Sequence, residues 1–156
     1  MKKLSLIALI AAFGVFTAAA VTINVPFYND GGTSLSAGYP GSGTATFIGI
    51  RNGDLDNPVQ GSVYYYDNDG TDRTPDPFTF PIAKGSSVSF RPVATDTAEG
   101  KAGAAVPNKD PAGQEAGTAT IVLEGSDPNQ YSARVQVLNA AQSDSQYTLL
   151  PFQPTP

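Results

Sequence analysis

Apolar and polar residues alternate over short stretches of the chain, most clearly between residues 59 and 92. Alternation with a period of two predicts half-buried β-strands, and here it occurs three times between groups of turn-forming residues. The expected strands are residues 59–66, 78–82 and 87–91. Fully burying a large apolar side chain contributes about 1.5–3 kcal/mol, so the apolar residues of these strands are the first candidates for the core. They are Phe78, Phe80, Val88 and Phe90.

Other residues of this region refine the prediction. Pro81 cannot donate to a strand ladder, so its strand is expected at a sheet edge or at a bulge. Arg91 follows Phe90 in the alternation and is expected to face solvent. Tyr64, Tyr65 and Tyr66 are consecutive, so at least one of them must face outward. We favour packing for the tyrosines over a second role, in which exposed rings stack on a ligand such as a sugar.

Similar alternation recurs along the rest of the chain. Further strands are expected at residues 21–27, 44–51, 118–124, 131–137 and 146–152. Residues 94–117 are different, because they are rich in Ala, Gly, Pro, Asp and Lys and follow no period. Loops of this length are normally functional or mobile. About seven to eight short strands without a convincing helix predict an all-β fold, an antiparallel Ig-like or fibronectin-III-like β-sandwich formed by one domain over residues 21–156.

The first expected strand has a possible role in assembly. Val21, Ile23, Val25 and Phe27 lie on one face by alternation, and Pro26 predicts an edge position. Apolar strands at chain termini are the segments most easily exchanged between subunits, so these four residues are candidates for insertion into a neighbouring sheet. The alternative is that the strand pairs within its own domain, as most strands of single-domain sandwiches do.

The N-terminal residues have the pattern of an export signal. Met1, Lys2 and Lys3 form a basic start, residues 4–16 are apolar, and residues 17–20 are small. This pattern predicts a signal peptide over residues 1–20, with Val21 as the new N-terminus, and therefore a bacterial-type secreted, extracellular or cell-surface protein without stable membrane insertion after cleavage. An uncleaved membrane anchor is the alternative. The chain has no cysteine, so neither a lipid anchor on cysteine nor a disulfide framework is available.

Charge and composition narrow the function classes. The formal net charge is −5 and includes Lys2 and Lys3, so the exported part is more acidic still. This argues against nucleic acid and anionic membrane surfaces as partners. Histidine and cysteine are both absent, so Ser-His-Asp, Cys-His and zinc-histidine sites cannot form. We therefore expect no enzyme activity, and a hydrolase that uses carboxylates alone is a minor alternative.

An acidic turn follows the strand of residues 59–66. Asp67, Asp69 and Asp72 place hard oxygen ligands in one short loop, which is the chemistry that Ca²⁺ requires. The EF-hand pattern is not met, because the expected glycine and glutamate positions do not match. A calcium loop of another type is the hypothesis, and a solvated acidic turn is the favoured alternative. No other cofactor is expected.

Three patterns in residues 63–92 resemble a known class of domain. They read V-x-Y-x-D-x-D-G, then F-x-F-P, then S-V-S-F-R-P. In this respect the chain resembles bacterial exported Ig-like domains of poorly defined function. The resemblance implies a sandwich outside the cytoplasm and transfers no catalytic residue.

These observations lead to two functional hypotheses. The first is a non-catalytic structural or adhesive protein of the cell exterior, such as the self-assembling subunit of a filament, sheath or surface layer. Its partners would be other copies of itself, other surface proteins or glycans. The second is a secreted module that binds a carbohydrate or another surface polymer, stabilised by calcium at the acidic turn.

Overall fold

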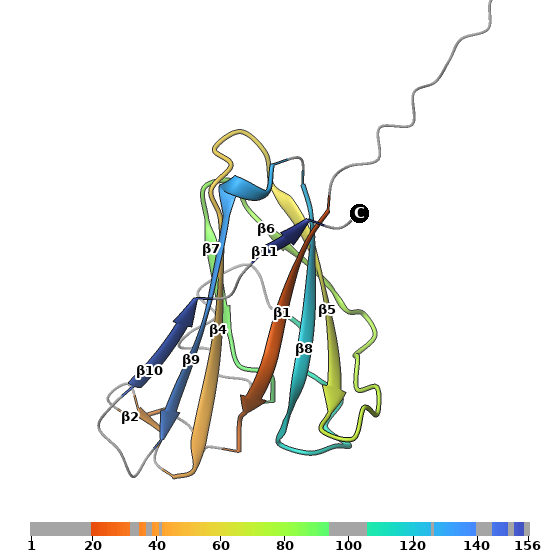
Figure 1. Cartoon of the computed structure of the whole chain (residues 1–156), viewed down its shortest axis with the longest axis vertical. Coiled ribbons are helices and arrows are strands. Elements are labelled where there is room, and N and C mark those ends of the chain that lie inside the picture. Colours follow the sequence, from red (N-terminus) through yellow and green to blue (C-terminus); the bar gives the residue numbers. More distant parts are fainter. Residues whose placement is uncertain are drawn as a thin grey trace, which may run out of the picture.

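The computed structural model describes residues 20–31, 35–36, 39–40, 42–93, 106–125, 127–139, 145–149 and 152–154. They form an all-β structure in which two antiparallel sheets lie face to face, consistent with a β-sandwich (Figure 1). The helical structure of these residues is one 3₁₀ turn, Pro128–Gln130. None of the described helices is long and apolar enough to cross a membrane. The expected signal peptide falls on residues 1–20, which lie outside the described part except for Ala20.

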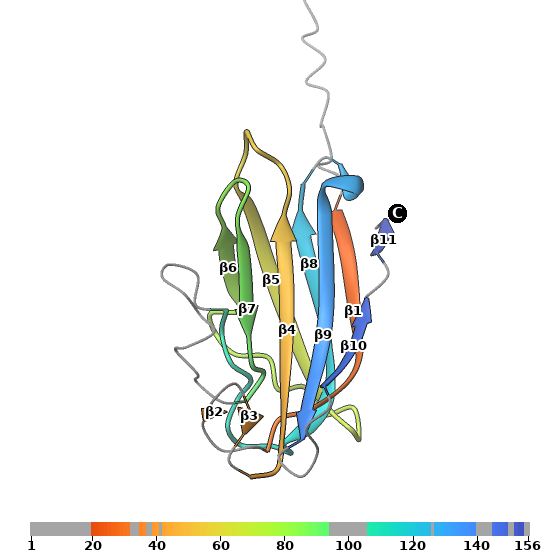
Figure 2. The same cartoon turned by 90° about the vertical axis from the view of Figure 1, so that its left-hand side faces the viewer.

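The larger sheet has five strands in the order β11-β1-β8-β5-β6. Their bounds are β1 Ala20–Asn29, β5 Val59–Asp67, β6 Thr79–Ile82, β8 Ala116–Glu124 and β11 Phe152–Pro154. The second sheet has four strands in the order β10-β9-β4-β7 (Figure 2). Their bounds are β4 Thr44–Asn52, β7 Ser87–Phe90, β9 Tyr131–Asn139 and β10 Ser145–Leu149. A short hairpin of β2 (Leu35–Ser36) and β3 (Tyr39–Pro40) completes the set.

The three strands expected between residues 59 and 92 are confirmed, and they divide between the two sheets. β5 pairs with β6, whereas β7 crosses to the other sheet and pairs with β4. β6 carries Pro81 and lies at the edge of its sheet, as predicted. The strand expected over residues 146–152 is instead two strands in different sheets, β10 beside β9 and β11 beside β1.

The core lies between the two sheets and is built mainly from aliphatic and aromatic side chains. Its largest fully buried members include Tyr28, Tyr65, Phe80, Ile23, Ile48, Ile50, Ile82, Ile121 and Leu123. Phe80 and Phe90 are buried as predicted. Phe78 and Val88 are half-buried, and the ring of Phe78 packs against Tyr64 at 5.3 Å between centroids. Tyr65 faces the core, whereas Tyr64 and Tyr66 are half-buried, as the alternation requires.

β1 differs from the prediction in two respects. It is not an edge strand, because β8 pairs with it on one side and β11 pairs with it at Val21–Ile23 on the other. A β-bulge between Val25 and Tyr28 also shifts the alternation, so Phe27 is 50% exposed and Tyr28 enters the core instead. The bulge includes Pro26, which has no N–H to donate, and bulges are where a strand can accommodate proline.

The two sheets are joined at one end by a buried ion pair. Asp30 follows β1 and Arg91 follows β7, and both side chains are fully buried. The Oδ1 atom of Asp30 accepts a hydrogen bond from Nε of Arg91 at 2.7 Å and lies 2.6 Å from Nη2 of the same side chain. The Oδ2 atom accepts from the backbone N–H of Val93 at 2.8 Å. The guanidinium also lies over the ring of Phe47, 5.7 Å from its centroid, which is a cation–π geometry.

This arrangement corrects the expectation that Arg91 faces solvent. The alternation does place Arg91 opposite to Phe90, but that face is covered at this end of the sheet by Asp30 and Phe47. Because an unpaired buried charge is costly, each member of the pair depends on the other.

We predict that Arg91→Met will lower the free energy of unfolding by about 3–5 kcal/mol, since it leaves the carboxylate of Asp30 buried without its cation. Adding Asp30→Asn to that variant should restore part of the loss, because asparagine keeps the oxygen that accepts the backbone amide but removes the charge. Denaturant unfolding of the two variants measures both effects. Arg51→Met, which alters an exposed arginine of β4, is the matched control and should change stability by less than about 0.5 kcal/mol.

Candidate functional site

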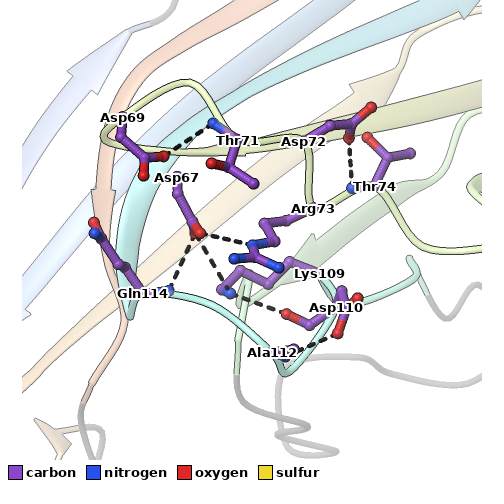
Figure 3. A network of polar contacts seen from close by, with 10 residues as sticks. All are labelled: Asp67, Asp69, Thr71, Asp72, Arg73, Thr74, Lys109, Asp110, Ala112 and Gln114. Atoms are coloured by element: carbon purple, nitrogen blue, oxygen red, sulfur yellow. Dashed lines mark hydrogen bonds and ion pairs between the residues drawn. The ribbon is translucent and has the colours of Figure 1, made fainter.

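The acidic turn after β5 is built by side chains that bond their own backbone. Asp69 accepts from the N–H of Thr71 at 3.0 Å, and Asp72 accepts from the N–H of Thr74 at 2.8 Å (Figure 3). Gly70 has a φ of 84°, a left-handed conformation that glycine adopts without steric cost. Hydrogen bonds from the backbone and side chain of Thr71 hold the pKa of the Asp69 carboxyl group below its usual range, and hydrogen bonds from the side chain and backbone of Thr74 do the same for Asp72.

Asp67 points away from this turn and into the protein. Its carboxylate is 2.6 Å from Nε of Arg73 and 3.9 Å from Nζ of Lys109, and it accepts from the backbone N–H of Gln114 at 3.1 Å (Figure 3). Asp67 and Lys109 are both buried. We refer to Asp67, Arg73 and Lys109 as the Asp67 cluster. The backbone of Gly113 lies directly against it, since a Cβ there would fall 2.8 Å from an atom of each of the three side chains.

The carboxylates of Asp67, Asp69 and Asp72 do not point to one common position. Asp67 is directed toward two cations, whereas Asp69 and Asp72 are exposed and bond the turn itself. In the part of the chain that the structure describes, no group of three or more His, Cys, Asp or Glu side chains could hold a metal ion. Arg73 and Lys109 provide the positive charge that an ion would otherwise provide.

The described half of the long connection between β7 and β8 is bonded to both sheets. The N–H of Lys109 donates to the carbonyl of Pro92 at 2.9 Å, and the N–H of Asp110 donates to the carbonyl of Arg73 at 3.0 Å. The hydroxyl of Tyr65 donates to the carbonyl of Pro107 at 2.9 Å. Residues 106–115 therefore close this end of the sandwich, and β8 begins at Ala116, two residues earlier than the sequence predicts.

Tyr28 is a buried tyrosine that is close enough to both buried carboxylates to be affected by their charges. Its ring meets that of Tyr65 edge to face, with centroids 6.2 Å apart, and its buried hydroxyl has no hydrogen-bond partner among the described residues. Burial raises the pKa of Tyr28 to about 12, and the negative charges of Asp67 and Asp30 add to the effect. Burial raises the pKa of Tyr65 as well.

The residues proposed for strand exchange divide into two groups. Val21, Ile23 and Val25 are at most 1% exposed and belong to the core of their own chain. Phe27 is half-exposed at the bulge and lies beyond Ile23, the last residue of β1 that pairs with β11. Of the four candidates, Phe27 is the one available at the surface.

Sequence reasoning did not anticipate the buried charges. Asp30 stands before two glycines, Asp67 belongs to the acidic turn considered for calcium, and Lys109 lies in a region without any periodicity. Arg73 is only six residues from Asp67, but the other partners are far away in the sequence: Arg91 is 61 residues from Asp30, and the amide that bonds Asp67 is 47 residues away. No local pattern in the chain marks these pairs.

The buried charges have partners within the fold. The buried ionisable side chains Asp30, Arg91, Asp67 and Lys109 contact each other or backbone groups, so their charges are used to hold segments of the chain together.

No protein-family model, no curated protein and no solved structure matches the chain.

We predict that Asp67→Asn will lower the free energy of unfolding by about 3 kcal/mol, because Lys109 then remains buried with a neutral partner. Asp69→Ala, which alters an exposed side chain of the same turn, should cost no more than about 1 kcal/mol. Thermal unfolding of the wild type should be the same in calcium and in EDTA. A calcium-dependent rise in Tm that Asp69→Ala abolishes would contradict this assignment of the turn.

We predict that Tyr28→Phe will leave the protein as stable at neutral pH or increase its stability by about 1 kcal/mol, because it removes a buried hydroxyl that has no described partner. In the wild type, the unfolded chain loses the Tyr28 proton near pH 10 and the folded protein near pH 12. Stability should therefore be complete below pH 10 and fall as the pH rises toward 12. Unfolding measured across this range should show a shallower fall for Tyr28→Phe, and an identical fall in both proteins would refute the assignment.

Proposed function

We propose that this chain is a non-catalytic structural or adhesive protein of the cell exterior, which assembles with copies of itself into a filament, sheath or layer. In this proposal residues 1–20 are a signal peptide that is removed, and the remainder is a single Ig-like sandwich. The first residue after cleavage would be Val21, at the start of β1. The proposal rests on a surface feature of β1 and on the use of the buried charges.

The observation that carries the proposal is the position of Phe27. It is a large apolar side chain with half of its surface exposed, and it follows a stretch of β1 whose outer side is paired with β11. That pairing covers Val21–Ile23, and no described strand continues it along the rest of β1. An apolar side chain beside a strand edge that no described strand pairs with is a starting point for pairing between chains.

The buried charges support a structural role in a different way. Burying a charge costs several kcal/mol, and here the cost is offset by contacts within the fold. The buried ion pairs therefore hold separate segments together at this end of the sandwich, in a chain that has no cysteine and so no disulfide to do so.

We predict that Phe27→Asp will weaken self-association without weakening the fold, because an exposed position tolerates a charge while an apolar contact between chains does not. The measurement is sedimentation velocity over a range of concentrations, with electron microscopy of the same samples. The protein should be recovered after export, with its N-terminus checked by mass.

Leu55→Asp is the matched control, since Leu55 is 71% exposed but lies in the loop between β4 and β5 and not on a strand. It should assemble as the wild type does. A wild type that remains monomeric at high concentration and forms no fibre or layer would overturn the proposal. Equal loss of assembly in both variants would show that β1 is not the interface.

A further inference from the structure

A second surface feature lies on the outer face of the four-stranded sheet. β7, β4 and β9 run side by side there (Figure 2), and their outward residues enclose a groove of about 240 Å³. The alternate residues of the same strands, including Ile50 and Ala133, belong to the core, so the groove faces away from the second sheet. The outward residues that line it are Gly49, Arg51, Ser87, Ser89, Ser132 and Arg134.

The strand register arranges these six residues in two rows. Gly49 lies opposite Ser89 on one side and Arg134 on the other. Arg51 lies opposite Ser87 and Ser132 in the same way. The two arginines are thus diagonal neighbours on adjacent strands, a spacing of about 7–8 Å that long side chains can bridge. Serine hydroxyls lie beside each of them.

Gly49 determines how Arg134 lies. A Cβ at position 49 would be 3.3 Å from Nε and 3.4 Å from Cγ of Arg134, so the arginine side chain lies across the glycine. The absence of a side chain at position 49 lets the side chain of Arg134 lie close to the sheet. A side chain that is already placed loses less entropy when it binds a ligand.

The lining also defines the chemistry of the ligand. It contains two arginines and no carboxylate, although the chain as a whole has a net charge of −5. Arginine binds carboxylates through two parallel hydrogen bonds, and serine hydroxyls can donate to or accept from sugar hydroxyls. The lining contains no aromatic residue, so it offers no platform for stacking a neutral sugar or a nucleic-acid base.

We propose that this groove binds an acidic polysaccharide whose sugars carry carboxylate groups, with Arg51 and Arg134 each contacting one carboxylate and the serines contacting hydroxyls. The net negative charge of the chain repels polyanions at longer range, so binding should be local to the groove and sensitive to salt. The site is separate from β1 and does not depend on self-assembly.

The experiment uses the exported full protein at a concentration where it is monomeric. The probe is polygalacturonate, and fully methyl-esterified polygalacturonate has the same backbone without the charges. Calorimetric titration at low salt should show binding to the first and none to the second. Arg51→Ala and Arg134→Ala should each weaken binding about tenfold, the loss expected for a charge-assisted hydrogen bond.

Two further variants separate positioning from charge. Gly49→Ala keeps both arginines but displaces Arg134, so it should weaken binding while leaving Tm close to that of the wild type. Lys84→Ala removes an exposed cation from the turn between β6 and β7, outside the groove, and should leave binding unchanged.

The proposal is overturned by four results. These are no binding to polygalacturonate at low salt, equal binding to the esterified polymer, equal losses in Lys84→Ala and the arginine variants, and tighter binding to dextran sulfate or single-stranded DNA than to polygalacturonate.

Discussion

Two buried carboxylates close one end of the sandwich, and much of the structure depends on them. Asp30 lies just beyond β1 and Asp67 at the last position of β5, and the start of β8 pairs with both of these strands. Removing a charge from water costs several kcal/mol unless cations and hydrogen-bond donors replace the water. Each carboxylate has both kinds of partner: an arginine, and a backbone amide from a connecting segment.

The two buried carboxylates help to explain why residues 106–115 adopt a defined backbone structure, although their composition is typical of an irregular loop. Residues 106–115 have no hydrophobic period, yet their backbone is bonded to Pro92 beside one sheet and to Arg73 beside the other. Tyr28 packs on Tyr65, and the hydroxyl of Tyr65 donates to the carbonyl of Pro107 in the same segment. The ion pairs, the packed tyrosine rings and the bonded loop therefore stabilise this end of the sandwich together. Hydrophobic contacts alone would leave its buried polar groups without hydrogen-bond partners.

The sequence was sufficient for the fold class and for most strands, because alternation is a local signal. β5, β6 and β7 appear where their patterns predict them, and Pro81 marks an edge. The bulge in β1 was not predictable in detail, since one extra residue reverses which side of the strand faces the core. The charge pairs were not predictable at all, because Asp30–Arg91 and Asp67–Lys109 are set by the tertiary structure and not by spacing. The direction of the Asp67 side chain was not predictable either, because an acidic turn does not reveal by itself that Arg73 and Lys109 approach one of its carboxylates.

The two carboxylates fix these connecting segments as firmly as backbone pairing fixes the strands. Native-state hydrogen exchange of the backbone amides of Val93 and Gln114 tests this most directly, because each donates to one of the carboxylates and neither lies in a strand. Protection as strong as that of Ile48 in the core is predicted for both, with much weaker protection for the amide of Ala112, which donates to an exposed carboxylate. Exchange of Val93 and Gln114 as fast as that of Ala112 would contradict it.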